Sequence, residues 1–233
     1  CGWNHDEFDM LGIDLATHDD RYDQGQEWID IVTRAWTSAE PFDYDGRFYQ
    51  VHKTDINPKP YGGGQPLVVC AGNSERGRDF AARNADMMFT NLRIDLDEVP
   101  GNTSALKELA AGYNRDIGVF SNVAVTCRPT KKEAEEYFQY YAVENADWDA
   151  AENMIVGRGI VKPGMTDEMH QAARIRAAAG NGALPIVGDP DDVVAMMKRL
   201  SEGGISALAI GFTNYLEHFP YFRDEVLPRL VHG

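Results

Sequence analysis

The sequence predicts an α/β fold built around a parallel β-sheet. Short apolar runs typical of buried strands alternate with stretches of helical periodicity, and this alternation continues to the end of the chain. The clearest case is the last unit, where a helix that starts at Asp189 is followed by an apolar run over residues 205–212. A helix and a hairpin precede the first strand–helix unit, so the parallel sheet is expected to begin after them.

The first expected elements are a helix and a β-hairpin. Asp19 and Asp20 fall near the start of the helix, where the helix dipole favours carboxylates. In the segment 41–51, two aromatic stretches flank Asp45-Gly46, which predicts a tight hairpin turn. The helix is expected to present one apolar face, formed by Trp28, Ile31, Val32, Ala35 and Trp36.

Four apolar segments are the candidate parallel strands. A closed (β/α)8 barrel needs eight strands and typically about 250 residues, so half of such a barrel is represented. Helical periodicity separates these segments, and residues 145–183 have weak periodicity with several glycines. This last segment is expected to be an insertion with some helix near residues 167–178. The candidate strands are residues 67–71, 86–90, 118–126 and 205–212.

The last unit carries clear helix signals. The apolar run 184–188 leads into Asp189, which suits an N-cap, and Pro190 suits the first helical position. Gly203-Gly204 is expected to end this helix, and a closing amphipathic helix is expected over residues 221–230. The core face of the first of these helices is expected to comprise Val193, Val194, Met197 and Leu200.

Composition excludes several classes of function. The formal net charge is -15, which argues against nucleic-acid binding because phosphate backbones need a basic face. Three widely spaced cysteines without a CxxC pair suggest neither a zinc site nor a disulfide framework, and they favour a reducing compartment. No apolar run is long enough for a membrane span, and the N-terminus has no signal-peptide pattern. A cytoplasmic protein without metal is therefore expected.

A strand-to-helix turn is the first candidate site. Gly72, Asn73 and Ser74 follow an apolar strand and precede a helix. A glycine allows close backbone approach, and free N–H groups at a helix N-terminus bind phosphate, with the serine hydroxyl as a further donor. The alternative is an ordinary turn in which Asn73 or Ser74 only caps the helix.

A second candidate is the His18–Tyr22 stretch. His18 and Tyr22 are four residues apart and share a face if the stretch is helical. Both side chains can donate a hydrogen bond to a phosphate oxygen. The alternative is a solvated helix start with Tyr22 packed on the core.

Two further stretches are candidates for contacts with a substrate. Arg174 and Arg176 precede a glycine-rich segment and could clamp an anion, although a surface helix with two solvated arginines has the same pattern. The segment 212–218 follows the last strand, where barrel enzymes place their active sites, although a plain βα loop is equally compatible. Its candidate pocket residues are Thr213, Asn214, Tyr215 and His218.

Taken in order, these stretches resemble the bacterial luciferase-like flavin monooxygenases. Each motif alone is common, but their order and spacing are specific, and the resemblance spans nearly the whole chain. The similar branches are the alkanesulfonate, dimethyl sulfone and pyrimidine-ring monooxygenases. The resemblance rests on residues 2–4, 7–8, 12–14, 18–22, 27, 41–49, 71–74, 80–82, 85–86, 184–190 and 219–228.

The resemblance implies a fold and an activity. It places residues 1–233 in the second half of a TIM (β/α)8 barrel, with the insertion at about 145–183 as a possible lid, and it implies that the chain is inactive without the first half. The activity implied is oxygenation of a small organic substrate by dioxygen and reduced FMN, which a separate NAD(P)H-dependent flavin reductase supplies. The complete protein is expected to be a homo-oligomer.

The resemblance also implies roles for individual residues. His18 and Tyr22 would contact the flavin phosphate, together with the turn residues Gly72, Asn73 and Ser74. Arg176 would serve the substrate in the catalytic site. The sulfonate branch has a tyrosine where this chain has Thr213, which argues against a sulfonate substrate.

Two alternatives to the oxygenase remain open at this point. The same fold could use a deazaflavin cofactor for hydride transfer, or the chain could belong to a non-catalytic flavin-binding protein. Oxygen uptake with reduced FMN would distinguish the first alternative from the oxygenase. Flavin binding without turnover would indicate the second.

Overall fold

The computed structural model describes residues 2, 5–92 and 96–231, and the chain divides into two compact units. The first unit comprises residues 1–88 and 106–117, and the second comprises residues 89–105 and 118–233. The boundaries between the units fall inside strand β4 (Met87–Phe89), inside helix α4 (Val99–Ala111) and between Ile117 and Gly118.

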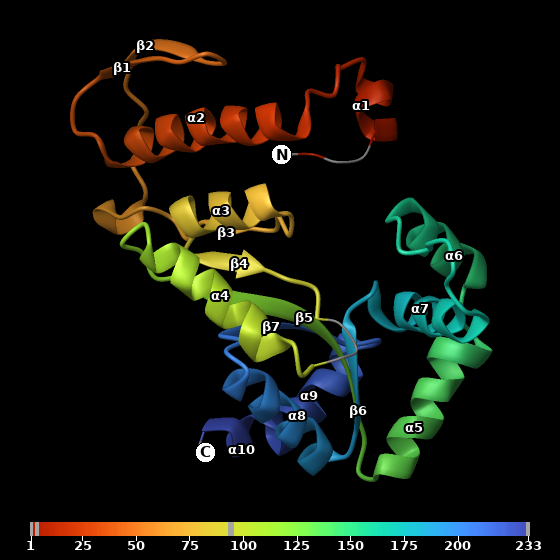
Figure 1. The fold of residues 1–233 in the computed structure, drawn as a ribbon. Coiled ribbons are helices and arrows are strands. Elements are labelled where there is room, and N and C mark those ends of the chain that lie inside the picture. Colours follow the sequence, from red (N-terminus) through yellow and green to blue (C-terminus); the bar gives the residue numbers. More distant parts are fainter. Residues whose placement is uncertain (1, 3–4, 93–95, 232–233) are drawn as a thin grey trace. The chain divides into compact units, whose positions relative to one another are not determined.

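The first unit begins with helices and a hairpin and then enters its parallel strands (Figure 1). Thr17 caps α2, and its hydroxyl oxygen accepts the backbone N–H of Asp20 at 3.2 Å. The elements are α1 (His5–Leu11), α2 (His18–Thr37), β1 (Phe42–Asp45), β2 (Gln50–Thr54), η1 (Tyr61–Gly63), β3 (Val69–Cys70), α3 (Glu75–Asn84) and the start of β4.

Helix α2 is confirmed, but its buried face differs from the predicted one. Tyr22, Ile29 and Ala35 are buried, whereas Trp28 is 52% exposed. Because residues 28 and 29 are both apolar, either of two neighbouring faces of the helix could be buried, and tertiary packing determines which one is. Tyr22 contacts Phe80 of α3, with ring centroids 5.8 Å apart, so the stripe containing Tyr22 faces α3.

The hairpin predicted around Asp45-Gly46 is present as the antiparallel pair β1–β2. Glu27 of α2 holds its turn, because its carboxylate accepts the backbone N–H groups of Arg47, Phe48 and Tyr49 at 2.8, 2.8 and 3.0 Å. Burial opposes ionisation of Glu27, but these three hydrogen bonds outweigh it and lower the pKa of the carboxyl. The side chain of Glu27 therefore joins α2 to the hairpin.

The first unit also contains the parallel pair β3–β4, with Val69 beside Met87 and Cys70 beside Met88. Both strands are shorter than the apolar runs predicted. Asp86 extends the contact beyond the strands, because its carboxylate accepts the backbone N–H of Val68 at 2.9 Å and pairs with Arg115 at 3.1 Å.

The second unit is organised around one long strand, β5, and helices pack along it (Figure 1). Tyr140–Glu144 forms a π-helical turn, η2, after α5. The remaining elements are β5 (Gly118–Cys127), α5 (Lys131–Gln139), α6 (Trp148–Gly157), α7 (Asp167–Gly180), β6 (Leu184–Gly188), α8 (Pro190–Glu202), β7 (Ala207–Gly211), α9 (Tyr215–Glu225) and α10 (Leu227–Val231).

Strand β5 pairs in parallel with both β6 and β7. Val123 of β5 lies beside Leu184 of β6 and beside Ile210 of β7. The prediction of four parallel strands was therefore one short, since the described residues contain five, β3 to β7. Residues 184–188 were expected only to lead into a helix. Pro185 argues against a central strand, but β6 lies at the edge of the sheet order, where a missing N–H is tolerated.

The end of the chain confirms one prediction and corrects another. Asp189 caps α8 by accepting the backbone N–H groups of Asp191 and Asp192, both at 3.0 Å. All four residues predicted for its core face are buried. The closing helix starts earlier than predicted, because Asn214 caps α9 and the helix begins at Tyr215. His218 therefore lies in a helix and not in a loop.

The segment 145–183 is more helical than its sequence predicts. Helices α6 and α7 pack on one another through a small buried cluster of Ala151, Ile155 and Ala177. The helix expected near residues 167–178 is confirmed as α7, whereas α6 was not expected, because short alanine contacts of this kind give only a weak apolar period. In the described part of the chain, no helix has both the length and the apolarity to cross a bilayer.

Candidate functional site

In the first unit, the two halves of the predicted phosphate site meet. The Ser74 hydroxyl lies 3.5 Å from the Tyr22 hydroxyl, although 52 residues separate them. Ser74 is also the N-cap of α3, since its hydroxyl oxygen accepts the Gly77 N–H at 3.1 Å. The cap uses a lone pair of this oxygen, and its proton donates over the long 3.5 Å contact to Tyr22, which a ligand oxygen could replace. Capping and ligand binding are thus compatible roles for Ser74.

Gly72 has no side chain, and this leaves room for the Tyr22 hydroxyl. A Cβ atom at residue 72 would lie 2.6 Å from the Tyr22 hydroxyl and 3.0 Å from the Cα of Gly77. A Cβ at residue 77 would meet the same hydroxyl at 2.6 Å. Only glycine leaves room at these two positions, so the phenol tip reaches the backbone at the start of α3. The N–H groups of the first turn of a helix have no intrahelical acceptor and can bind an anion, although in α3 the Ser74 cap already takes the N–H of Gly77.

His18 lies beside Tyr22, as the i, i+4 spacing predicted. The two rings contact edge to face with centroids 5.1 Å apart. The imidazole is about half exposed, and its Nδ1 lies 3.3 Å from the carboxylate of Asp19. His18 is therefore placed at the rim of the cluster, whereas Tyr22 is buried.

The charges around this cluster are largely paired. Arg76, in the first turn of α3, lies 2.5 Å from Asp23 and 3.8 Å from Asp19, both on α2. The carboxylate of Asp20 pairs with Arg47 at 2.7 Å, and hydrogen bonds from Thr17 and Arg47 lower its pKa. An anion at this cluster would meet neutral hydroxyls and backbone N–H groups as its main donors.

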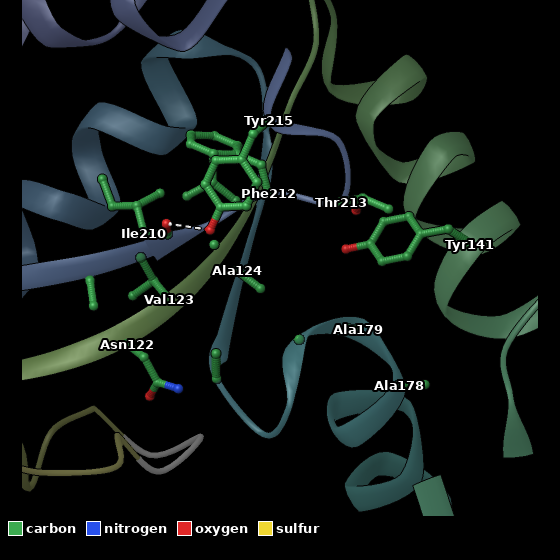
Figure 2. A pocket seen from close by; sticks show the side chains of 15 residues that line it. Asn122, Val123, Ala124, Tyr141, Ala178, Ala179, Ile210, Phe212, Thr213 and Tyr215 are labelled. Carbon is green, nitrogen blue, oxygen red and sulfur yellow. Dashed lines mark hydrogen bonds between the residues drawn. The ribbon is translucent and has the colours of Figure 1, made fainter. Parts of the chain in front are cut away.

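The second unit contains a cavity of about 440 Å³. It lies against β5 and β7, the C-terminal end of α7 and the loop that starts α9 (Figure 2). Its walls are mostly alanine, glycine, valine and isoleucine. Polar side chains come from Asn122 on β5, Tyr141 on η2, and Thr213 and Tyr215 after β7.

Two of the four residues predicted after the last strand line this cavity, namely Thr213 and Tyr215. The Tyr215 hydroxyl donates to the carbonyl of Ile210 at 3.2 Å, as the dashed line in Figure 2 shows. Asn214 has a structural role, because its side-chain oxygen accepts the Glu217 N–H at 3.4 Å as the cap of α9.

His218 is buried, and its Nε2 lies 2.9 Å from the guanidinium of Arg128. A guanidinium can only donate, so Nε2 of His218 accepts from Arg128, while Nδ1 lies 3.4 Å from the backbone N–H of Asn214. Tyr137 packs against both partners: its ring meets His218 edge to face and lies 4.0 Å from the Arg128 guanidinium carbon. Burial and the charge of Arg128 lower the pKa of His218. This cluster of Arg128, Tyr137 and His218 is a buried scaffold.

Tyr141 is a cavity residue that the sequence did not reveal. Its hydroxyl lies 3.0 Å from that of Thr126 on β5, and burial raises its pKa. The residue lies in the π-helical turn Tyr140–Glu144, which interrupts the regular helical spacing after α5. No local pattern signals such a turn. Asn122 was also missed, since it sits inside a strand otherwise rich in apolar residues.

The two arginines of α7 are both engaged within the fold. Arg174 pairs with Glu152 at 3.2 Å and lies over the ring of Trp148. Arg176 donates to the carbonyls of Gly182 and Ala183 at 2.8 and 3.2 Å, and also to that of Leu92.

Arg176 is absent from the described lining of the cavity, although Ala178 to Gly180 of the same helix belong to it. Burial lowers the pKa of Arg176. The geometry gives this residue a positioning role in the turn after α7, and direct contact with a substrate stays a prediction.

The sequence profile of the luciferase-like monooxygenases matches residues 1–207. The chain belongs to this family. The branch suspected from the motifs is also confirmed by curated relatives.

Among the relatives of this luciferase-like chain is an FMNH(2)-dependent dimethylsulfone monooxygenase of Pseudomonas fluorescens, with 26% identity over 97% of the chain and 62% of the relative. Another is the pyrimidine monooxygenase RutA of Allorhizobium ampelinum, with 25% identity over 97% of the chain and 63% of the relative. The chain therefore spans less than two thirds of the length of these relatives.

A solved structure shows the same fold. DmoA from Hyphomicrobium sulfonivorans superposes with a TM-score of 0.81 at 21% identity, and the match covers 99% of this chain and 59% of DmoA. At this identity the comparison establishes the α/β fold of luciferase-like proteins and leaves the chemistry of this chain to its own residues.

Proposed function

We propose that this chain carries the flavin-phosphate site of a monooxygenase that uses reduced FMN and dioxygen to oxygenate a small organic substrate. The observation that carries the proposal is the convergence of Tyr22 and Ser74 at the start of α3. Two of the similar proteins support the cofactor, since both dimethylsulfone monooxygenases are named as FMNH(2)-dependent.

The residues at the convergence fit a phosphate group. Tyr22 and Ser74 offer hydroxyl donors, Asn73 and the first turn of α3 offer N–H donors, and Gly72 leaves the space that any Cβ would fill. His18 would donate from the rim. In a net acidic protein these donors must be supplied locally, and here α2, the turn 72–74 and the first turn of α3 supply them.

When bound, the reduced flavin would supply the oxygen chemistry, and the protein would bind, orient and exclude water. The cavity of the second unit suits the substrate, because its walls are apolar and its few polar groups converge from separate elements. Helices α6 and α7 form the proposed lid, and Arg176 would support the substrate by fixing the turn that follows α7.

The chain is proposed to correspond to the second half of a TIM barrel, with its other strands outside residues 1–233. Five parallel strands and a match to about three fifths of DmoA support this view. The proposed partners follow from the chemistry: an NAD(P)H-dependent reductase supplies the reduced flavin, and the complete barrel assembles as a homo-oligomer.

Oxygen consumption tests the proposed activity. The full protein, mixed anaerobically with reduced FMN and then exposed to dioxygen and candidate substrates, should form an oxygenated product. Reduced deazaflavin without dioxygen should give no turnover. Turnover with deazaflavin alone, or FMN binding without any oxygenated product across a broad substrate panel, would contradict the proposal.

A further inference from the structure

Gly211 is the last residue of β7, and it lines the cavity of the second unit. Glycine weakens a strand, because it loses the most conformational freedom on folding and has no side chain to pack. A strand that keeps a glycine usually does so for a β-bulge, for a backbone conformation that other residues avoid, for the close approach of another backbone, or for a ligand. The structure distinguishes these four reasons at Gly211.

The backbone at Gly211 has a conformation that any residue can adopt. Its φ lies outside the positive range, in contrast to Gly182 with a φ of 82° and Gly204 with a φ of 91°. Strand β7 pairs with β5 residue by residue along 207–211, opposite 120–124, so these described residues form no bulge. The first two reasons for a glycine are therefore excluded at residue 211.

Packing does not require a glycine at residue 211 either. An added Cβ would lie 3.6 Å from the carbonyl oxygen of Val123 and 4.0 Å from the Tyr215 hydroxyl, which are ordinary van der Waals contacts. Among the described residues outside its chain neighbours, no other heavy atom lies within 4 Å of that Cβ. Gly180, which also lines the cavity, is different: its Cβ would meet that of Ala124 at 2.6 Å, so the packing of α7 on β5 requires glycine there.

The space that Gly211 leaves open belongs to the cavity. Gly211 pairs with Ala124 of β5, and paired residues of parallel strands point to the same face of the sheet. Ala124 and Tyr215 are among the residues that line this cavity in Figure 2. A side chain at residue 211 would therefore extend into the cavity, beside the Tyr215 hydroxyl.

We infer that Gly211 is a specificity-determining residue: its missing side chain admits a bulky apolar group of the substrate and sets the size limit at this end of the cavity. The neighbouring wall is apolar, with Val123, Ala124 and Ile210 in the lining, so an apolar group placed there is removed from water. This inference rests on the proposed function and deepens it, because it names the residue that limits the size of the substrate.

Thermal stability separates this role from a structural one. Gly211→Ala should raise the melting temperature by about 1–4 °C, because alanine fits the folded backbone and restricts the unfolded chain. Gly180→Ala is the matched comparison and should lower it, because its Cβ would meet Ala124. A lower melting temperature for Gly211→Ala would show that the fold requires glycine at residue 211 and would overturn the inference.

Ligand-detected NMR titration of the full protein without flavin tests the size limit. Phenol and 4-phenylphenol share a hydroxyl group and differ by one rigid ring. Gly211→Val should weaken the binding of 4-phenylphenol by about tenfold or more and that of phenol by less than about threefold, with a smaller effect of the same kind in Gly211→Ala. Gly101→Ala, in α4 where a Cβ meets open space, is the matched control and should change neither affinity.

Three binding results would contradict a size limit at Gly211. They are an equal change for the two phenols in Gly211→Val, no change for either, and no detectable binding of 4-phenylphenol to the unaltered protein.

The flavin is the competing occupant of this space. FMN affinity in Gly211→Val, measured by fluorescence titration, should equal that of the unaltered protein. A loss of FMN affinity with both phenols unchanged would assign the space to the flavin and refute the inference. The phenol titrations use no flavin, whereas the proposed function is tested by oxygen consumption, so failure of the one is distinguishable from failure of the other.

Discussion

The Ser74 hydroxyl lies 3.5 Å from the Tyr22 hydroxyl, and Gly72 lies close enough that a Cβ atom on it would meet the same phenol. The distance is long for a strong hydrogen bond between hydroxyl groups. Two donors at this separation can instead share one acceptor oxygen. This contact between Tyr22 and Ser74 joins α2 to the start of α3, and the proposed phosphate site rests on it.

Gly72→Ala should displace the Tyr22 hydroxyl. The Tyr22 side chain can move away from the added Cβ. The Cα of Gly77, 3.0 Å from that Cβ, belongs to the backbone and can shift only slightly. We expect a loss of about 1–3 kcal/mol in the free energy of unfolding, the usual cost of overpacking, and weaker FMN binding. Urea denaturation and FMN titration measure both effects.

Gly101→Ala is the control for this change. Residue 101 lies in α4 with open space where a Cβ would stand. Alanine there should leave FMN affinity unchanged and stabilise the protein by about 0.5–1 kcal/mol, since glycine is costly inside a helix. If the two variants had the same FMN affinity and the same free energy of unfolding, Gly72 would have no specific role in the site.

Arg176→Ala should loosen the turn after α7. The guanidinium donates to the carbonyls of Gly182, Ala183 and Leu92, and hydrogen bonds to a charged group each contribute about 1.5–3 kcal/mol. We expect a lower melting temperature and slower turnover, with FMN affinity nearly intact. Arg223→Ala, at an exposed pair with Asp224, should change none of these. Loss of FMN binding with normal turnover would show that the role given to Arg176 is wrong.

The pH dependence of stability should report on His218. Its pKa is lowered from the ordinary value of 6.5 by burial and by Arg128, with Glu217 opposing. Below that value the unfolded chain takes up a proton that the folded chain still resists. The unfolded state then binds more protons, so the free energy of unfolding falls as the pH drops below 6.5.

Urea midpoints measured from about pH 5 to pH 8 test this prediction, since histidine titrates in that range. His218→Gln keeps an acceptor for Arg128 and should remove part of the slope. His52→Gln, at an exposed residue on β2, should keep the slope of the unaltered protein. An unchanged slope in His218→Gln would mean that another group carries it.

The sequence predicted local features well and long-range ones less well. Asp189 and Pro190 together predicted the start of α8. The four-residue spacing of His18 and Tyr22 predicted that they share a helix face, where their rings are in contact. These signals lie within one helix turn. The family resemblance added the pairing of Tyr22 with Ser74, which no local pattern contains.

The features that were missed depend on tertiary contacts. Trp28 and Ile29 are equally apolar, and only packing against α3 decides which is buried. Pro185 made the edge strand β6 hard to predict, and the π-helical turn that contains Tyr141 has no sequence signature. Arg176 carries the charge expected of a ligand-binding residue, yet its partners are backbone carbonyls that the chain supplies after folding.

The central claim is that Tyr22 and Ser74 bind the phosphate of FMN. Removing a hydrogen bond to a charged group costs about 1.5–3 kcal/mol, so Ser74→Ala combined with Tyr22→Phe should weaken FMN binding more than tenfold. Riboflavin lacks the phosphate, and its affinity should hardly change.

The deciding measurement is therefore the FMN and riboflavin affinities of the unaltered full protein and the double variant, compared by fluorescence titration. We expect the double variant to lose affinity for FMN and to keep its affinity for riboflavin. An equal loss for both flavins, or no loss for either, would contradict it.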